Sequence, residues 1–159
     1  MTQAAYDGAV FLQDAMRTVE TYRKSIRADF GGIPEARMWE RPVPGQVSAA
    51  NLVLHLTGNL RHFFGHELGG SGYRRERDRE FEDRSGPGQK EILEAWDAAC
   101  AETVEVLGGL DPGRLTHPAP AGSFRDDPPV HRYIVHLITH LTYHAGQIRS
   151  LYRMLAPNP

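Results

Sequence analysis

The stretch from Tyr133 to Leu155, YIVHLITHLTYHAGQIRSLYRML, decides the fold. Its apolar residues recur at the 3.6-residue period of an amphipathic α-helix. The resulting core stripe holds Tyr133, Leu137, His140, Leu141, His144, Ile148, Leu151 and Leu155. Two positions at which a helical bundle would hold Leu or Ile are therefore imidazoles. Because an unpaired buried polar group costs roughly 1–3 kcal/mol, both rings need partners for their nitrogens.

Three further segments show helical periodicity, and no strand pattern of any length is present. We expect these helices to span about 3–30, 48–68 and 87–109. The fourth helix should begin after an N-cap at Asp127, with Pro128 in its first turn. The charged segment 73–84 shows no helical stripe and is expected to be a loop. The sequence thus predicts an all-α fold, a four-helix bundle with long connections that forms one domain over residues 1–159.

The composition excludes several classes of protein. Hydrophobic residues make up 40% and charged residues 24% of the 159 residues, a globular balance. The net charge of −2 argues against a general nucleic-acid or membrane-surface partner, and the single cysteine, Cys100, excludes an internal disulfide. There is no signal-peptide pattern, and no apolar run approaches the roughly 18 residues that span a bilayer. We therefore expect a cytoplasmic protein.

Three histidines indicate a metal site. His140 and His144 are four residues apart, so their rings lie one turn apart on one helix face. His55 lies on the apolar face of its own helix, in the run NLVLHLTGNL from Asn51 to Leu60. Packed together, the two helices would supply three neutral nitrogen ligands and leave a coordination position open. Three imidazoles suit several divalent transition ions, among them zinc, nickel, iron and manganese, so these residues alone do not name the metal.

Other interpretations of these residues stay open. Each histidine can instead bond a backbone carbonyl or a buried water. His136, one turn before His140, is an alternative ligand or a pocket residue. Asn59 and Gln147 would orient the ligands or bound water, or form a hydrogen bond between helices. Leu141 occupies the position of the carboxylate in an HExxH motif, which argues against a metalloprotease of that type.

The charged segment also has two interpretations. Three of its arginines, Arg75, Arg77 and Arg79, would form a rim that binds an anionic small-molecule substrate through their guanidinium groups. Alternatively, the interleaved acids and bases form a solvated loop with weak local ion pairs. No catalytic residue is assigned by these patterns.

With these motifs in hand, the chain resembles the DinB-like superfamily of four-helix-bundle metalloproteins. The resemblance rests on residues 51–59, on residues 136–148 and on Arg77–Phe81. It implies a metal triad of His55, His140 and His144, a zinc or nickel ion, and a homodimer. The common His-Arg-Gly-Gln of the family is His144-Ala145-Gly146-Gln147 here, so any role of that arginine is absent. The family name reflects induction by DNA damage, which implies a stress response but not DNA binding.

Characterised relatives of that superfamily include transferases of low-molecular-weight thiols such as bacillithiol, and a mycothiol-dependent isomerase. The leading hypothesis is therefore a metal-dependent enzyme that transfers such a thiol onto electrophilic small molecules. A metal-dependent hydrolase that uses metal-bound water is the second hypothesis, weakened by the lack of an evident carboxylate base. The third is a metal-binding protein without catalytic activity.

Overall fold

Four long helices build the protein, as predicted. The computed structural model describes residues 7–120, 122, 124 and 126–157. The long helices are α1 (Gly8–Gly31), α2 (Ala49–Leu60), α4 (Gln89–Gly109) and α5 (Val130–Leu155). Shorter helical segments are η1 (Glu35–Arg37), η2 (Arg61–Leu68), α3 (Arg77–Glu82) and η3 (Pro112–Thr116). In the described residues, β-structure is limited to an isolated bridge between Pro118 and Pro129.

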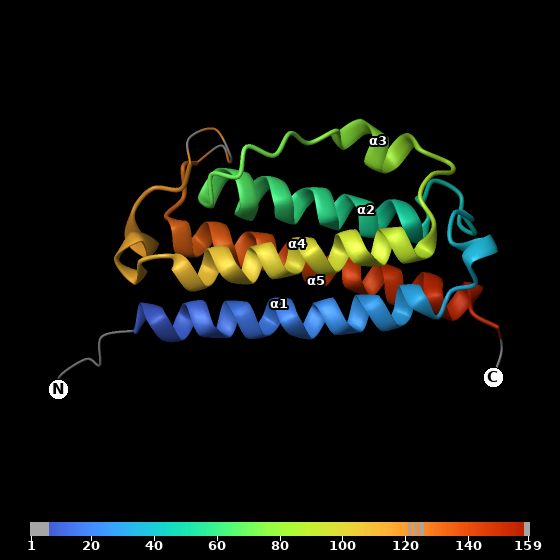
Figure 1. Cartoon of the computed structure of the whole chain (residues 1–159), viewed down its shortest axis with the longest axis horizontal. Coiled ribbons are helices and arrows are strands. Elements are labelled where there is room, and N and C mark those ends of the chain that lie inside the picture. Colours follow the sequence, from blue (N-terminus) through green and yellow to red (C-terminus); the bar gives the residue numbers. More distant parts are fainter. Residues whose placement is uncertain (1–6, 121, 123, 125, 158–159) are drawn as a thin grey trace.

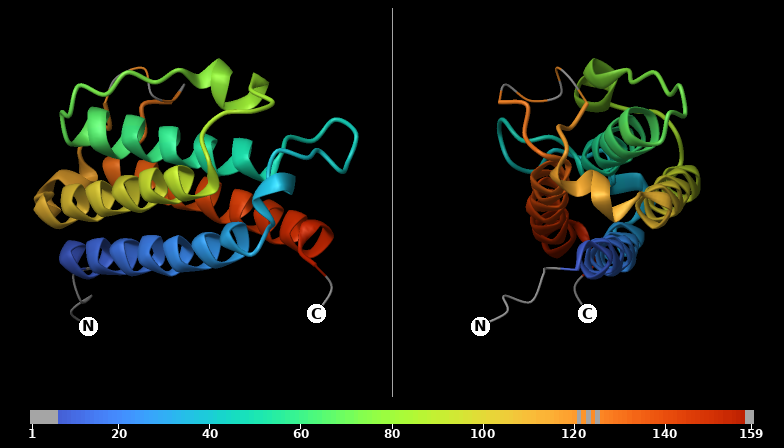
Figure 2. Two further views of the ribbon diagram at one scale, coloured as in Figure 1. Left: turned by 45° about the vertical axis from the view of Figure 1, so that its right-hand side comes forward. Right: turned by 90° about the vertical axis from the view of Figure 1, so that its left-hand side faces the viewer.

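The long helices surround one core. Helix α1 packs against α4 and α5, and α2 packs against the same two helices on the opposite side. Figures 1 and 2 show that α2 and α4 run in one direction and α1 and α5 in the other. Because α2 and α4 are parallel neighbours, the chain between them must return along the bundle. This return, residues 69–88, passes over the outer side of α2 and carries α3 (Figure 1).

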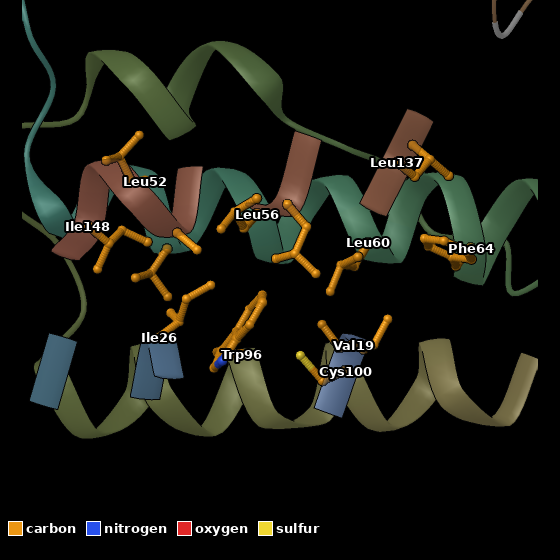
Figure 3. Packing of buried hydrophobic residues seen from close by; sticks show 14 of the residues in the cluster. Val19, Ile26, Leu52, Leu56, Leu60, Phe64, Trp96, Cys100, Leu137 and Ile148 are labelled. Atoms are coloured by element: carbon orange, nitrogen blue, oxygen red, sulfur yellow. The ribbon is translucent and has the colours of Figure 1, made fainter. Parts of the chain in front are cut away.

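The core side chains come from all four long helices (Figure 3). Val19 of α1, Leu56 of α2, Trp96 of α4 and Ile148 of α5 are each fully buried. The Trp96 indole keeps its hydrogen bond inside this core, because Nε1 donates to the backbone carbonyl of Arg23 at 3.2 Å. The apolar faces of the helices therefore pack against one another as their periodicity predicts. This packing holds α2 against α5.

The charged segment differs from the prediction, because residues Arg77–Glu82 form the short helix α3 instead of a loop. The helix has no apolar stripe that sequence periodicity can detect. Its exposed side is held by the ion pair of Arg79 with Glu76 at 2.8 Å. Its buried residue is Glu80, and Phe81 is only partly buried. A buried ionic contact, rather than apolar burial alone, therefore attaches α3 to α2.

The second helix also departs from regular periodicity. Ser48 caps it as expected and forms a capping box with Asn51. From Arg61 to Leu68, however, the helix widens into the π-helical segment η2. Phe64 follows the buried Leu60 by four residues and is itself buried, whereas Phe63, four residues after Asn59, is only partly buried.

The predicted starts of α5 and α1 can also be compared with the structure. Helix α5 begins at Val130, and Asp127 is not its N-cap. Helical geometry is disfavoured for a residue that precedes proline. The Pro128-Pro129 pair therefore delays the start of α5. The Val130 amide donates instead to the carbonyl of His117 at 2.9 Å. The predicted start of the first helix near residue 3 lies outside the described residues.

Candidate metal centre

Three histidine rings meet between α2 and α5. One nitrogen from each of His55, His140 and His144 lies within 4.8 Å of the corresponding nitrogens of the other two. The Nε2 atoms of His55 and His140 are 3.2 Å apart, and those of His144 and His140 are 3.1 Å apart. Each pair of rings is close to perpendicular, with interplanar angles of 71° to 80°. Three imidazole edges therefore converge on one point.

The helices place these rings for the reasons that the sequence suggested. His140 and His144 occupy successive turns of α5, beside the buried Leu141 and Ile148. His55 projects from the fully packed side of α2, where Leu52 and Leu56 are buried. The ring of His55 is 4% exposed, whereas His140 and His144 are partly exposed. The cluster thus lies at the edge of the core, where a small molecule can approach it from the α5 side.

The second ring nitrogen of His55 is held by α3. Its Nδ1 atom lies 3.0 Å from Oε2 of Glu80, a carboxylate that is 7% exposed. Arg75 in turn donates to both Glu80 oxygens, from Nε to Oε1 and from Nη2 to Oε2, each at 2.7 Å. Burial alone would raise the pKa of Glu80, but the hydrogen bonds from His55 and Arg75 and their charges together lower it. The carboxylate is therefore ionised at neutral pH.

The sequence analysis did not identify Glu80. The residue stands in a charged run without periodicity, where nothing distinguishes it from the exposed Asp78 or Glu82. A signal was nevertheless present in Gly58, three residues after His55 in the quoted helix motif. A Cβ atom at Gly58 would lie 2.0 Å from Oε1 of Glu80, so this helix position must be glycine for the carboxylate to approach.

The ring of His144 is held in a similar way. Its Nδ1 atom lies 2.6 Å from Oε1 of Gln147. Burial lowers the pKa of His144, the Gln147 hydrogen bond opposes this effect, and the charge of His55 adds to the lowering. Burial and the neighbouring rings lower the pKa of His140 to about 4. The rings of His140 and His144 are therefore neutral at pH 7, the state in which histidine binds metals.

These contacts fit a divalent cation. Only an Nδ1–H group can donate to the carboxylate of Glu80 or to the carbonyl oxygen of Gln147. The partners thereby assign the unprotonated nitrogen to Nε2 in both His55 and His144, the same atoms that converge. Facing lone pairs repel one another, and a cation between them removes this repulsion. Three neutral imidazoles are, moreover, a familiar ligand set for zinc and related ions.

The remaining predicted site residues are placed around the cluster. Asn59 is buried on α2, and within the described structure its amide makes no hydrogen bond to the three histidines. His136 is exposed and lines a separate hollow of about 310 Å³ with Phe124 and Arg132. His136 is therefore not part of the converging set, although its charge contributes to the lowered pKa of His140.

The three arginines that were predicted to form a rim do not lie in a common arrangement. Arg75 is engaged with Glu80, and its side chain is only 9% exposed. Arg77 is exposed and lies over the ring of Phe81, with its guanidinium carbon 5.1 Å from the ring centre. Arg79 is exposed and pairs with Glu76. Substrate contacts from this segment would therefore come from Arg77 or Arg79 rather than from Arg75.

A small hollow reaches the cluster beside His144. Its volume is about 210 Å³, and it is lined by Gly45, Gln46, Val47, Leu52, Phe81, Tyr143, His144 and Gln147. None of these side chains is a carboxylate, an ammonium or a guanidinium group. The hollow therefore offers an uncharged, largely apolar surface next to one of the three converging rings, which suits a small molecule without charge.

Comparisons with known proteins add to this geometry. The sequence model of a family described as mycothiol-S-transferase matches residues 15–155. The matched region includes the three histidines together with Glu80 and Gln147. A comparison with proteins of curated function found no match. Across the described residues, no helix combines the length and the apolar character needed to cross a membrane.

Proposed function

Because the chain belongs to the mycothiol-S-transferase family, a branch of the DinB-like superfamily, we propose that it is a metal-dependent transferase that joins mycothiol to electrophilic small molecules. The observation that carries this proposal is the convergence of the His55, His140 and His144 Nε2 atoms at the edge of the core. Mycothiol, rather than a bacillithiol-type thiol, is the first candidate for the thiol substrate, because it is the thiol that the family description names.

His55, His140 and His144 would hold the ion, with zinc and nickel the first candidates and iron and manganese the next. A bound divalent cation supplies positive charge that favours the thiolate form of a thiol, which is the reactive form. The protein's own contribution is to keep the rings of His140 and His144 neutral and to orient those of His55 and His144. Burial and the contacts with Glu80 and Gln147 support this role.

The hollow beside His144 supports an uncharged electrophile as the second substrate. Leu52 and Phe81 provide apolar walls that would exclude water from one side of the reacting atoms. Tyr143 and Gln147 provide polar groups at the same opening, where Gln147 Nε2 lies 3.4 Å from the Tyr143 hydroxyl. These groups would orient a carbonyl or halide substituent while the thiolate sulfur bonds to carbon. With a halide, the carbon–halogen bond breaks and the halide ion leaves; with a carbonyl-activated double bond, the displaced electron pair takes up a proton from water.

The alternatives receive less support from the site. A hydrolase needs a base for water, and Glu80 contacts a cluster histidine but is already occupied by Arg75 and by His55. A metal-binding protein without catalytic activity would not need a hollow that reaches a ligand ring. Homodimer formation, cytoplasmic location, a stress-response role and a single domain over the whole chain stay predictions.

The first test measures metal content by mass spectrometry on untagged protein purified without nickel resin. We expect about one ion per chain, lost in His144→Ala but retained in His117→Ala, which alters an exposed histidine. The metallated protein is then assayed with mycothiol and a bimane electrophile that becomes fluorescent when its carbon is attached to sulfur. A fully metallated sample that gives no mycothiol-dependent product with a panel of electrophiles would overturn the proposed function.

A further inference from the structure

Glu80 is buried in an otherwise exposed helix. Its neighbours Asp78, Arg79 and Glu82 all face solvent, whereas Glu80 is the buried residue of α3 and turns toward α2. There, Oε2 of Glu80 lies 3.0 Å from Nδ1 of His55. Nε and Nη2 of Arg75 lie 2.7 Å from Oε1 and Oε2 of Glu80, respectively. A buried carboxylate normally weakens a protein unless every charge has a partner. Such a costly arrangement therefore calls for a functional explanation.

We propose that Glu80 and Arg75 form a positioning pair that fixes His55 as an Nε2 metal ligand, an inference that rests on the proposed metal-dependent function. Glu80 accepts the Nδ1 proton of His55, which leaves the Nε2 lone pair directed at His140 and His144. Arg75 Nη2 also lies 3.0 Å from Nδ1, but an unprotonated Nδ1 would put two acceptors, Nδ1 and the ionised Oε2 of Glu80, only 3.0 Å apart. The hydrogen bond of Nδ1 therefore belongs to Glu80, and Arg75 acts on Glu80.

The glycine at position 58 is a second, independent sign of this pair. A Cβ atom there would lie 2.0 Å from Oε1 and 3.0 Å from Cδ of Glu80, and 3.3 Å from Nε of Arg75. A glycine inside a helix costs roughly 0.5–1 kcal/mol relative to alanine. Helix α2 accepts this cost at the place where the carboxylate and the guanidinium group approach its backbone.

Helix α3 also holds the face of the His55 ring. The ring centres of Phe81 and His55 are 4.5 Å apart, so consecutive residues of α3 contact the ring face and the ring nitrogen. This double contact leaves His55 little freedom to rotate. The positioning pair thus explains why an irregular charged segment folds onto α2 as a helix.

The experiment compares Glu80→Ala, Glu80→Gln and Gly58→Ala with Glu82→Ala, which removes an exposed carboxylate from the same helix. Zinc affinity is measured by competition with a chromophoric chelator, and the cobalt(II) form is examined by visible absorption. Loss of a group that holds a ligand histidine typically weakens metal binding 10- to 100-fold. We expect that loss in Glu80→Ala and Gly58→Ala, a smaller one in Glu80→Gln, whose amide oxygen still accepts, and none in Glu82→Ala.

A direct measurement keeps the inference separate from enzymatic activity. The imidazole nitrogen chemical shifts of His55 in metal-free, unaltered protein report which nitrogen carries the proton. We expect the proton on Nδ1, and its transfer to Nε2 in part of the Glu80→Ala molecules. If Glu80→Ala does not fold, Glu80→Gln and the unaltered protein decide the question. Wild-type affinity in Glu80→Ala, or an Nε2 proton on His55 in the unaltered protein, would overturn the positioning pair even if transferase activity were found.

Discussion

The Nδ1 atom of His144 lies 2.6 Å from the side-chain oxygen of Gln147, one turn further along α5. This contact and the one between His55 and Glu80 hold two of the three rings by their outer nitrogens. The third ring, His140, has a buried Nδ1 atom without a hydrogen-bond partner among the described residues. Its orientation therefore depends on its place in α5 and on the two rings beside it.

Gln147→Leu should weaken zinc binding about 10- to 100-fold, because the new side chain cannot accept the Nδ1 proton of His144. The ring then gains freedom to rotate and to carry its proton on Nε2. Chelator competition measures the affinity. Gln147→Glu is the matched control, since a carboxylate can accept the same proton, and it should bind at least as tightly as the unaltered protein. Equal affinity in all three proteins would show that the contact does not orient His144.

The metal-free protein should lose stability between about pH 6.5 and pH 4. Burial and neighbouring charges lower the pKa of His140 from 6.5 to about 4. In that interval the unfolded chain takes up a proton on this residue and the folded chain does not, so acid favours unfolding. Because the ring is partly exposed, solvent screening limits the effect to on the order of 1 kcal/mol. Urea unfolding in the presence of a chelator measures it across the pH range.

The pH effect has a matched pair of variants. His140→Gln removes this group and should make the dependence less steep, while the lowered pKa values of His144 and Glu80 still contribute; His117→Gln alters an exposed histidine and should leave the dependence unchanged. An unaltered slope in His140→Gln would assign the acid sensitivity to other groups. Saturating zinc should raise stability near pH 6 but make its dependence on pH steeper, because the ligand histidines hold no proton at the metal-binding nitrogen in the folded state and take one up on unfolding.

The fold and the histidine cluster could be predicted because both depend on regular spacing. A 3.6-residue period decides which side of a helix is buried, and a spacing of four places His140 beside His144 whatever the loops do. His55 required only that its helix present the same face that carries Leu52 and Leu56. The buried face of each helix and the placement of each histidine on that face therefore follow from the spacing of residues within that helix.

Other features depend on contacts that spacing does not encode. Glu80 is buried because Arg75 and His55 compensate its charge, and these partners come from different segments. The π-helical turns of η2 form between Arg61 and Leu68 without a sequence signal such as proline. In each case, tertiary packing overrides the pattern of the segment itself. Gly58 was the available clue, since a buried helical glycine indicates that something approaches the backbone closely.

Gly146→Ala should stabilise the protein. A Cβ atom at this position of α5 would meet no described atom within 4 Å, and the residue is exposed. Replacing a helical glycine with alanine then gains roughly 0.5–1 kcal/mol, because the unfolded chain loses conformational freedom. Thermal unfolding of the metal-free protein measures the gain, and zinc affinity should not change. Gly69→Ala is the opposite case, since its Cβ would lie 2.7 Å from the backbone oxygen of Gly65 and 2.6 Å from Val106, and should lower the melting temperature.

Cys100 should not react with a thiol reagent while the protein is folded. The side chain is fully buried in α4, and burial raises the pKa of the thiol, so little thiolate forms at pH 8. We expect no colour from an aromatic disulfide reagent in buffer and about one thiol per chain in denaturant.

The cysteine also separates two sources of sulfur in the proposed transfer. If mycothiol supplies the nucleophile, Cys100→Ala should keep mycothiol-dependent activity, with a loss of stability because a small core cavity is created. Activity is compared at a temperature where both proteins are folded, as judged by circular dichroism. Loss of activity in a folded Cys100→Ala protein would instead mean that the protein thiol takes part, and would require the core around α4 to open during turnover.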